Sequence, residues 1–191
     1  MAQAQPNQLR RPISFTRRLN EAWHKPALMV FLVIVLAHWV EHLVQAYQVY
    51  GMHWPRSQAG GFLGLFFPWL VSSELLHYVY AIVMLIGFIW LRPGFVGQGR
   101  TWWNIALAIQ IWHHFEHLLL LIQAALGTPF FGAAAPTSLL QLAFPRMELH
   151  LFYNAVVFAP MVIAMFYHSF PSADEAHRVK CSCALRKPAL T

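Results

Sequence analysis

The chain has 191 residues, of which 58% are hydrophobic and only 10% are charged, and it carries a formal net charge of +6. A water-soluble domain cannot bury that much apolar surface, so the composition excludes a soluble globular protein and favours an integral membrane protein. The length suits one compact domain.

Four apolar runs, each close to the roughly 20 residues that span a bilayer core, predict four transmembrane helices. The runs cover residues 26–47, 69–91, 102–126 and 147–167. Trp69, Trp90 and Trp102 lie at ends of runs, where an indole prefers the membrane interface. Pro26 and Pro93 are typical of a helix start and a helix stop. The predicted fold class is therefore an all-α integral membrane protein, a bundle of four transmembrane helices.

Basic residues precede the first run, occupy the second connection and follow the last run. They are Arg10, Arg11, Arg17, Arg18, Lys25, Arg92, Arg100, Arg178, Lys180, Arg186 and Lys187. Because positive residues stay on the cytoplasmic side, both termini are predicted to be cytoplasmic, while residues 48–68 and 127–146 face outward. We expect the first run to remain as an anchor, in a multi-pass protein of the plasma membrane. The lipid bilayer accounts for the basic balance, and no nucleic-acid partner is expected.

The chain also contains a predicted tandem duplication of a helical hairpin. The sequence AHWVEHLVQAYQ at 37–48 aligns without gaps on WHHFEHLLLLIQ at 112–123, and a looser match relates 67–80 to 144–153. Two hairpins in the same orientation predict a pseudo-two-fold axis along the membrane normal, with equivalent residues facing each other. The predicted division is a basic N-terminal segment 1–25, a membrane domain 26–168 with repeats 26–92 and 102–168, and a basic tail 169–191.

Each predicted helix carries one glutamate, and histidines accompany it. An ionisable group in hydrocarbon costs about 2.5–3.5 kcal/mol on insertion scales, so a bound group is expected to offset the cost. A rise of about 1.5 Å per residue places all the clusters at one level in the outer half of the bundle. The predicted metal ligands are His38, Glu41, His42, Glu74, His77, His113, Glu116, His117, Glu148 and His150.

The spacing of these residues predicts which of them face inward. His38, Glu41 and His42 follow i, i+3, i+4 spacing and share one helix face. Glu148 and His150 differ, because a two-residue step turns about 200° on a helix. Either Glu148 precedes the helix, or only one of the two faces the site.

Carboxylates and imidazoles packed in a dry bundle suit a pair of divalent metal ions, because the carboxylates neutralise the cations and the neutral imidazoles complete the coordination. Soluble four-helix di-iron and di-manganese proteins use Glu and Glu-x-x-His ligands, and Glu74-Leu-Leu-His77 has that form. Iron is the preferred metal, with manganese, zinc, copper and haem b as alternatives. We expect Glu41→Ala and Glu116→Ala each to remove bound metal.

Three functions fit this pattern. The first is a metal-dependent membrane oxidoreductase that acts on a lipidic or small apolar substrate, with a redox partner or quinone, and the sequence assigns no catalytic residue. The second is a b-type haem protein that exchanges electrons with quinone, with His38 facing His113. The third is a metal-ion or proton transporter, although the inner runs 27–37 and 82–91 are unbroken apolar walls that favour a site closed on the inside. Oligomerisation is compatible with each.

The remaining segments yield simpler expectations. The outer connections are rich in aromatic residues, notably at 60–68, and are predicted to lie in the interface over the site. His24, His168 and His177 are predicted on the cytoplasmic side, far from the outer site. Cys181 and Cys183 are expected as reduced thiols in a disordered tail, because two thiols cannot fill a structural zinc site.

Overall fold

The computed structural model describes residues 14–185. The basic residues Arg10, Arg11, Arg186 and Lys187, on which part of the topology prediction depends, lie outside the described residues. Four long helices make up the bundle. They are α2 (His24–Tyr50), α4 (Glu74–Leu91), α5 (Gly97–Leu126) and α6 (Arg146–Ser169). Each is long and apolar enough to cross a membrane, as the sequence predicted.

Two helix boundaries differ from the prediction. The run predicted from Trp69 is divided, because α3 (Pro68–Val71) ends before α4 begins at Glu74, with Ser73 as the N-cap of α4. Helix α5 begins at Gly97, earlier than expected, and ends at Leu126, where Gly127 with a φ of 62° forms a left-handed C-cap. The break before α4 places Glu74 in the first helical turn at the outer end.

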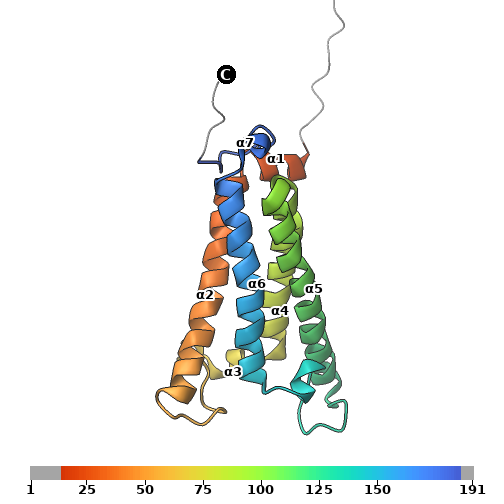
Figure 1. Cartoon of the computed structure of the whole chain (residues 1–191). Helices are drawn as coiled ribbons and strands as arrows, with labels where there is room; N and C mark the ends of the chain where they lie inside the picture. Colours follow the sequence, from red (N-terminus) through yellow and green to blue (C-terminus); the bar gives the residue numbers. More distant parts are fainter. Residues whose placement is uncertain (1–13, 186–191) are drawn as a thin grey trace, which may run out of the picture.

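Short elements close both ends of the bundle. Figure 1 shows α1 (Phe15–Glu21) and α7 (Ala173–Ala176) at one end, near both ends of the described chain. The 3₁₀ helix η2 (Arg92–Gly94) joins α4 to α5 at that same end. The opposite end carries α3 and two further 3₁₀ helices, η1 (Leu63–Leu65) and η3 (Leu140–Leu142). We call the end with α1, α7 and η2 the inner end, and the end with α3, η1 and η3 the outer end.

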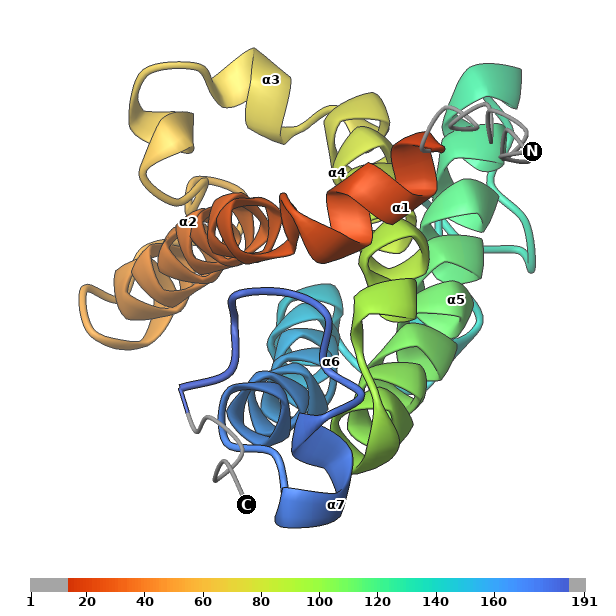
Figure 2. The ribbon, with the colours of Figure 1, turned by 90° about the horizontal axis from the view of Figure 1, so that it is seen from above.

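The long helices do not pack equally. Helix α5 packs along both α4 and α6, whereas α2 makes fewer contacts, with α4 and α6. Viewed down the bundle, α2 stands apart from the other three helices, and the segment with α3 reaches around between α2 and α4 (Figure 2).

The inner half of the bundle is a closed aromatic core. Phe88, Phe95, Trp103 and Met161 are fully buried. The rings of Phe95 and Trp103 stack with centroids 4.2 Å apart. The indole N–H of Trp103 donates to the Phe88 carbonyl oxygen at 2.8 Å, which satisfies the buried polar atom. This core closes the bundle on the inner side.

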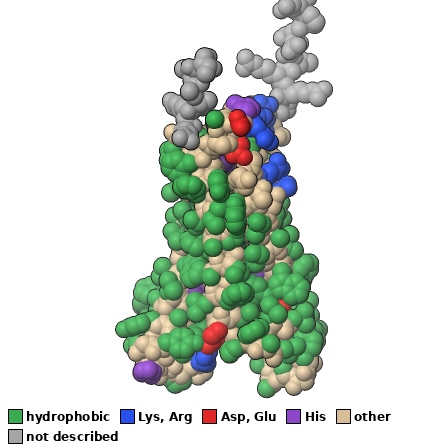
Figure 3. All heavy atoms as spheres, viewed as in Figure 1, with side chains coloured by type: hydrophobic (Ala, Val, Ile, Leu, Met, Phe, Trp, Pro, Cys, Tyr) green, Lys and Arg blue, Asp and Glu red, His purple; other side chains and the backbone are tan. Residues whose placement is uncertain are grey.

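The lateral surface of the bundle, along the sides of the helices, is apolar. Figure 3 shows hydrophobic side chains covering the sides of the helices, with charged side chains gathered near the ends. Large apolar residues such as Trp90, Phe115, Phe152 and Phe166 are exposed on this surface. An exposed apolar belt of this extent is what a multi-pass membrane protein presents to lipid.

Candidate metal centre

Six imidazoles from all four long helices meet in the outer half of the bundle. They are His38 and His42 of α2, His77 of α4, His113 and His117 of α5, and His150 of α6. The rings of His42 and His150 have centroids 5.0 Å apart, which joins α2 to α6. The six histidines that the sequence selected as ligands therefore lie together.

The most compact group is formed by His113, His117 and His150, which are all buried and whose ligand nitrogens lie within 4.8 Å of one another. The Nε2 atom of His117 lies 3.2 Å from that of His113 and 3.1 Å from that of His150. Two imidazole nitrogens that bind one tetrahedral ion at about 2.0–2.1 Å lie about 3.3–3.4 Å apart. Both of these distances, from His117 to His113 and to His150, are thus close to the spacing of ligands on a single ion.

A second group lies beside it. His38 and His42 have Nε2 atoms 3.0 Å apart. The Nδ1 of His42 lies 3.3 Å from Oε1 of Gln45, whose amide nitrogen donates to the Ala59 carbonyl oxygen. The Gln45 oxygen is therefore the acceptor, and a neutral His42 carries its proton on Nδ1. Its Nε2 lone pair then faces His38 and is available to a cation.

His77 lies between the two groups. Its Nδ1 donates to the Ser73 carbonyl oxygen at 3.0 Å, so Nε2 of the neutral ring is unprotonated. The ring centroid lies 6.1 Å from that of His117 and 5.8 Å from that of His150. A histidine that donates one ring N–H to a carbonyl and keeps the other nitrogen free is prepared to bind a metal.

Matched tyrosines cover the two groups. Tyr80 stacks on His38 with centroids 3.7 Å apart, and Tyr153 packs on His113 at 4.4 Å. These two pairs are equivalent in the predicted duplication. The duplication itself stays a prediction, which these matched contacts support.

Two of the four predicted carboxylates bind the outer connections. Both oxygens of Glu41 accept from the backbone N–H of Leu63, at 3.1 and 3.0 Å. Glu116 accepts from the Leu140 N–H at 3.3 Å and from the Ser138 hydroxyl. Each carboxylate therefore binds the segment that carries η1 or η3, at equivalent places in the two predicted repeats.

The other two carboxylates form ion pairs. Arg146 binds Glu74, and Arg56 binds Glu148, which also accepts from the Tyr50 hydroxyl. Hydrogen bonding to Glu148 raises the pKa of Arg56 further above its usual range. His150 joins the imidazoles while Glu148 lies at the exposed ion pair.

The closely spaced groups of ligand atoms found within residues 14–185 contain histidine and cysteine but no carboxylate. His114 packs against Tyr78, with ring centroids 5.3 Å apart, away from the six imidazoles. Asn154 shares a small cavity wall with His113.

The hydrogen bonds of the glutamates depend on how the outer connections fold, which the spacing within a helix does not reveal.

A cavity of about 670 Å³ opens between α2 and α4 and reaches the imidazoles. His38, His42 and His77 line one part of it, together with Glu41 and Arg146. The rest of the wall is largely apolar. It includes Ile34, Ala37, Leu63, Val71 and Leu76. A site that is apolar with a few convergent polar groups is typical of binding sites for small apolar molecules.

A separate cluster of possible ligands lies at the inner end, apart from the six imidazoles. It consists of His24, His168, Cys181 and Cys183. The expectation of a disordered tail at the two cysteines is wrong, because Cys183 is buried and Cys181 is half-buried against the bundle. The four residues are far apart in the sequence, so only the folded chain brings them together.

No family model, curated protein or solved structure matches this chain. Its class therefore rests on the fold and the site. The chain is an all-α protein with four helices apolar enough to span a membrane, and it contains buried histidine and histidine–cysteine clusters that can bind metal.

Proposed function

We propose that the chain is a membrane oxidoreductase with a histidine-bound dinuclear metal centre in the outer half of the bundle. One observation carries the proposal: a compact, buried group of three imidazoles lies beside an open apolar cavity with further imidazoles in its wall. Three protein ligands leave a coordination position open, as catalytic metal sites require. The cavity, whose wall includes His38, His42 and His77, would give a lipidic or small apolar substrate a route from the bilayer to the centre.

The first ion would be held by His113, His117 and His150. The predicted duplication assigns the second ion to the equivalent residues, which are His38, His42 and His77. When bound, the two ions supply the redox chemistry. The chain binds them through neutral rings and excludes water on the inner side through the aromatic core around Trp103.

The glutamates act around the ligands in this proposal. Glu41 and Glu116 bind backbone N–H groups of the outer connections and hold those segments over the centre. We therefore propose the six histidines as the direct ligands and all four glutamates as positioning residues. Iron is the preferred metal because it serves redox chemistry in sites built of histidine, although copper shares this property.

The topology proposed from the basic residues places the inner end in the cytoplasm of a plasma-membrane protein. Among the described residues, Arg17, Arg18, Lys25, Arg92 and Arg100 lie in α1, η2 or the inner ends of α2 and α5. The positive-inside rule assigns that end to the cytoplasm. A redox partner or quinone would then exchange electrons with the centre.

Metal content and absorption of the purified full chain test the proposal. We expect about two redox-active ions per chain and no Soret band. His117→Ala and His42→Ala should each lower the metal content. His114→Ala is the matched control, because His114 lies on the same helix beside His113 but packs against Tyr78, and it should retain the metal.

The same measurements separate this proposal from its alternatives. A Soret band would contradict it in favour of haem-based electron transfer. Zinc alone in the outer site would contradict the proposed redox-active metal centre, because zinc undergoes no redox change. Full metal retention in both His117→Ala and His42→Ala would remove the centre itself.

A further inference from the structure

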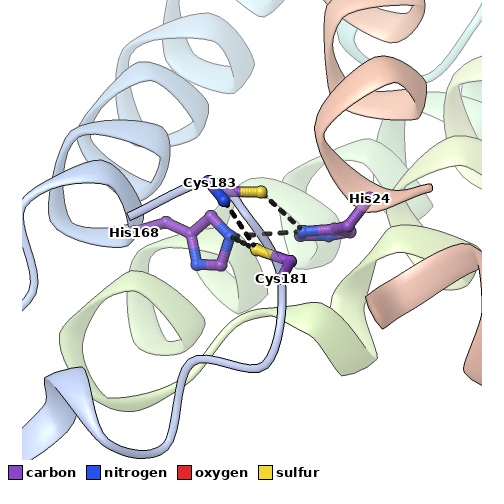
Figure 4. Close-up of side chains that lie close together, drawn as sticks. All are labelled: His24, His168, Cys181 and Cys183. Carbon is purple, nitrogen blue, oxygen red and sulfur yellow. Dashed lines mark hydrogen bonds between the residues drawn. The ribbon is translucent and has the colours of Figure 1, made fainter. Parts of the chain in front are cut away.

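The inner end of the bundle holds a second group of ligand side chains, separate from the outer imidazoles. His24 is the first residue of α2, and His168 lies in the last turn of α6. Cys181 and Cys183 follow α7 in the tail. Figure 4 shows the two rings and the two thiols pointing toward one another, although His24 and Cys183 are 159 positions apart.

The shortest distances within this group are close to those between the ligands of one tetrahedral ion. Nε2 of His168 lies 3.2 Å from Nδ1 of His24. The Sγ of Cys181 lies 3.2 Å from His168 Nε2, and the Sγ of Cys183 lies 3.5 Å from His24 Nδ1. All four ligand atoms lie within 4.8 Å of one another. A Zn²⁺ ion with bonds of about 2.0–2.1 Å to nitrogen and about 2.3 Å to sulfur separates its ligands by about 3.3–3.8 Å.

The protonation of His24 supports a bound cation. Its Nε2 lies 3.0 Å from the Leu91 carbonyl oxygen, which can only accept, so Nε2 carries the proton. The Nδ1 of the neutral ring is then a lone pair directed at the other three ligands. A zinc-binding histidine characteristically donates its second ring N–H to a backbone carbonyl in this way.

The surroundings fix the two histidines in place. His24 and His168 are 0% and 2% exposed. A Cβ atom at Gly94 would lie 2.4 Å from Nε2 of His24, so η2 approaches the ring closely only because residue 94 is glycine. The Phe95 ring packs on both histidines, with centroids 5.3 Å from His24 and 4.6 Å from His168.

The tail is held in the conformation that the site requires. The backbone N–H of Leu185 donates to the Ser169 carbonyl oxygen at 2.8 Å. The backbone N–H of Cys183 donates to the Sγ of Cys181 at 3.3 Å. An N–H that donates to sulfur stabilises a thiolate, which is the form of cysteine that binds metal.

We propose that His24, His168, Cys181 and Cys183 form a closed structural Zn²⁺ site that fastens the C-terminal tail to the inner ends of α2 and α6. Two thiolates and two neutral imidazoles balance the charge of a divalent ion, so the buried site is neutral. Four protein ligands leave no open position, which is the arrangement of structural rather than catalytic zinc. The proposed cytoplasmic location keeps the thiols reduced and available.

Titration of the reduced, metal-free full chain with Co²⁺ tests the site. Thiolate ligands give a sulfur-to-cobalt charge-transfer band that a histidine-only site lacks, so the outer centre does not contribute to this signal. We expect about one Co²⁺ per chain with this band, displaced by Zn²⁺. Cys181→Ser and Cys183→Ser should each weaken the band by at least about half, and the double variant should abolish it, because each thiolate contributes to the charge transfer. Ser182→Ala and His177→Ala are matched controls on exposed neighbours and should keep it.

Limited trypsin digestion provides a second readout of the tail. Lys180 is 76% exposed beside Cys181, so its cleavage depends on whether the backbone is held. Zn²⁺ should slow cleavage after Lys180 in the wild type and in Ser182→Ala, but not in Cys181→Ser.

Two results would overturn the zinc site. One is wild-type protein with free thiols that binds Co²⁺ without the charge-transfer band. The other is a disulfide between Cys181 and Cys183 in protein isolated without oxidants. The outer centre is judged separately, because His117→Ala should leave the band unchanged.

Discussion

Arg146, the first residue of α6, donates hydrogen bonds from two guanidinium nitrogens to the two oxygens of Glu74, the first residue of α4, at 2.5 and 2.6 Å. Arg56 makes the reciprocal contact with Glu148, including a bond of 2.9 Å from Nη1 to Oε2. In each pair the arginine belongs to one predicted repeat and the glutamate to the other. The two predicted repeats are therefore joined at the outer end by two ion pairs.

The two ion pairs should differ in their contribution to stability. The Glu74 side chain is 11% exposed, whereas that of Glu148 is 34% exposed and more strongly solvated. We expect Glu74→Gln to lower the free energy of unfolding by about 1–3 kcal/mol, because it removes a charge-assisted pair that is partly shielded. Glu148→Gln should cost at most about 1 kcal/mol. Thermal unfolding in detergent measures both, and a larger loss for Glu148→Gln would contradict this ranking.

The sequence predicted the four spans because each apolar run is long, and because tryptophan or proline marks ends of the first three runs. It also predicted which imidazoles meet, because His38 with His42 and His113 with His117 are four residues apart on one helix face. The break at Ser73 was not predicted, because Trp69–Val71 is as apolar as the helix that follows. Local composition does not encode that interruption.

The partners of the carboxylates could not be read from the sequence. Glu41 shares the helix face of His38 and His42, yet its two carboxylate oxygens accept from the Leu63 N–H. Leu63 lies in a connection whose sequence has no regular hydrophobic period. The inner cluster was missed for a related reason. His24 and His168 are 144 positions apart, and the short tail with its two cysteines gives no hydrophobic period that would place it against the bundle.

Gly61 is a position where the outer connection meets Glu41. Its φ is +73°, and an added Cβ would lie 2.5 Å from Oε2 of Glu41 and 2.9 Å from its backbone oxygen. Gly127 also has a positive φ, of +62°, but a Cβ there meets nothing within 4 Å. Gly127→Ala should cost roughly 1–2 kcal/mol through its backbone conformation alone.

We expect Gly61→Ala to cost more than Gly127→Ala, because it adds a steric clash to the same backbone strain and displaces Glu41 from the Leu63 N–H. Unfolding midpoints and proteolysis of residues 51–67 compare the two variants. Equal midpoints, with no increase in cleavage for Gly61→Ala, would show that Glu41 does not hold this connection.

A larger side chain at position 76 would fill part of the cavity between α2 and α4. Leu76 lines the cavity, whereas the neighbouring Leu75 is 58% exposed on the lateral surface of the bundle. Leu76→Trp should weaken binding of a fluorescent fatty-acid probe at least about tenfold, which is about 1.4 kcal/mol. Leu75→Trp adds the same side chain on the exposed surface and should bind the probe normally. Unchanged binding by Leu76→Trp, with intact metal content, would show that apolar molecules do not use this cavity.

Asn20 joins α1 to the inner end of α4 and to η2 through both the nitrogen and the oxygen of its side-chain amide. Its Nδ2 donates to the carbonyl oxygens of Thr16 and Trp90, each at 2.9 Å, and its Oδ1 accepts from the Gly94 N–H at 2.8 Å. The residue is 6% exposed, so Asn20→Ala leaves buried backbone groups without partners. Each such group costs about 1–3 kcal/mol.

We therefore expect Asn20→Ala to destabilise the protein and to speed hydrogen exchange at the Gly94 amide, because that N–H loses its acceptor. Arg17→Ala is the matched control on the same helix, since it removes an exposed pair with Glu21 that is worth about 0.3–0.5 kcal/mol. Hydrogen–deuterium exchange of the segment 92–96 measures the local effect. Equal exchange in the wild type and Asn20→Ala would mean that α1 is held to η2 by packing rather than by this amide.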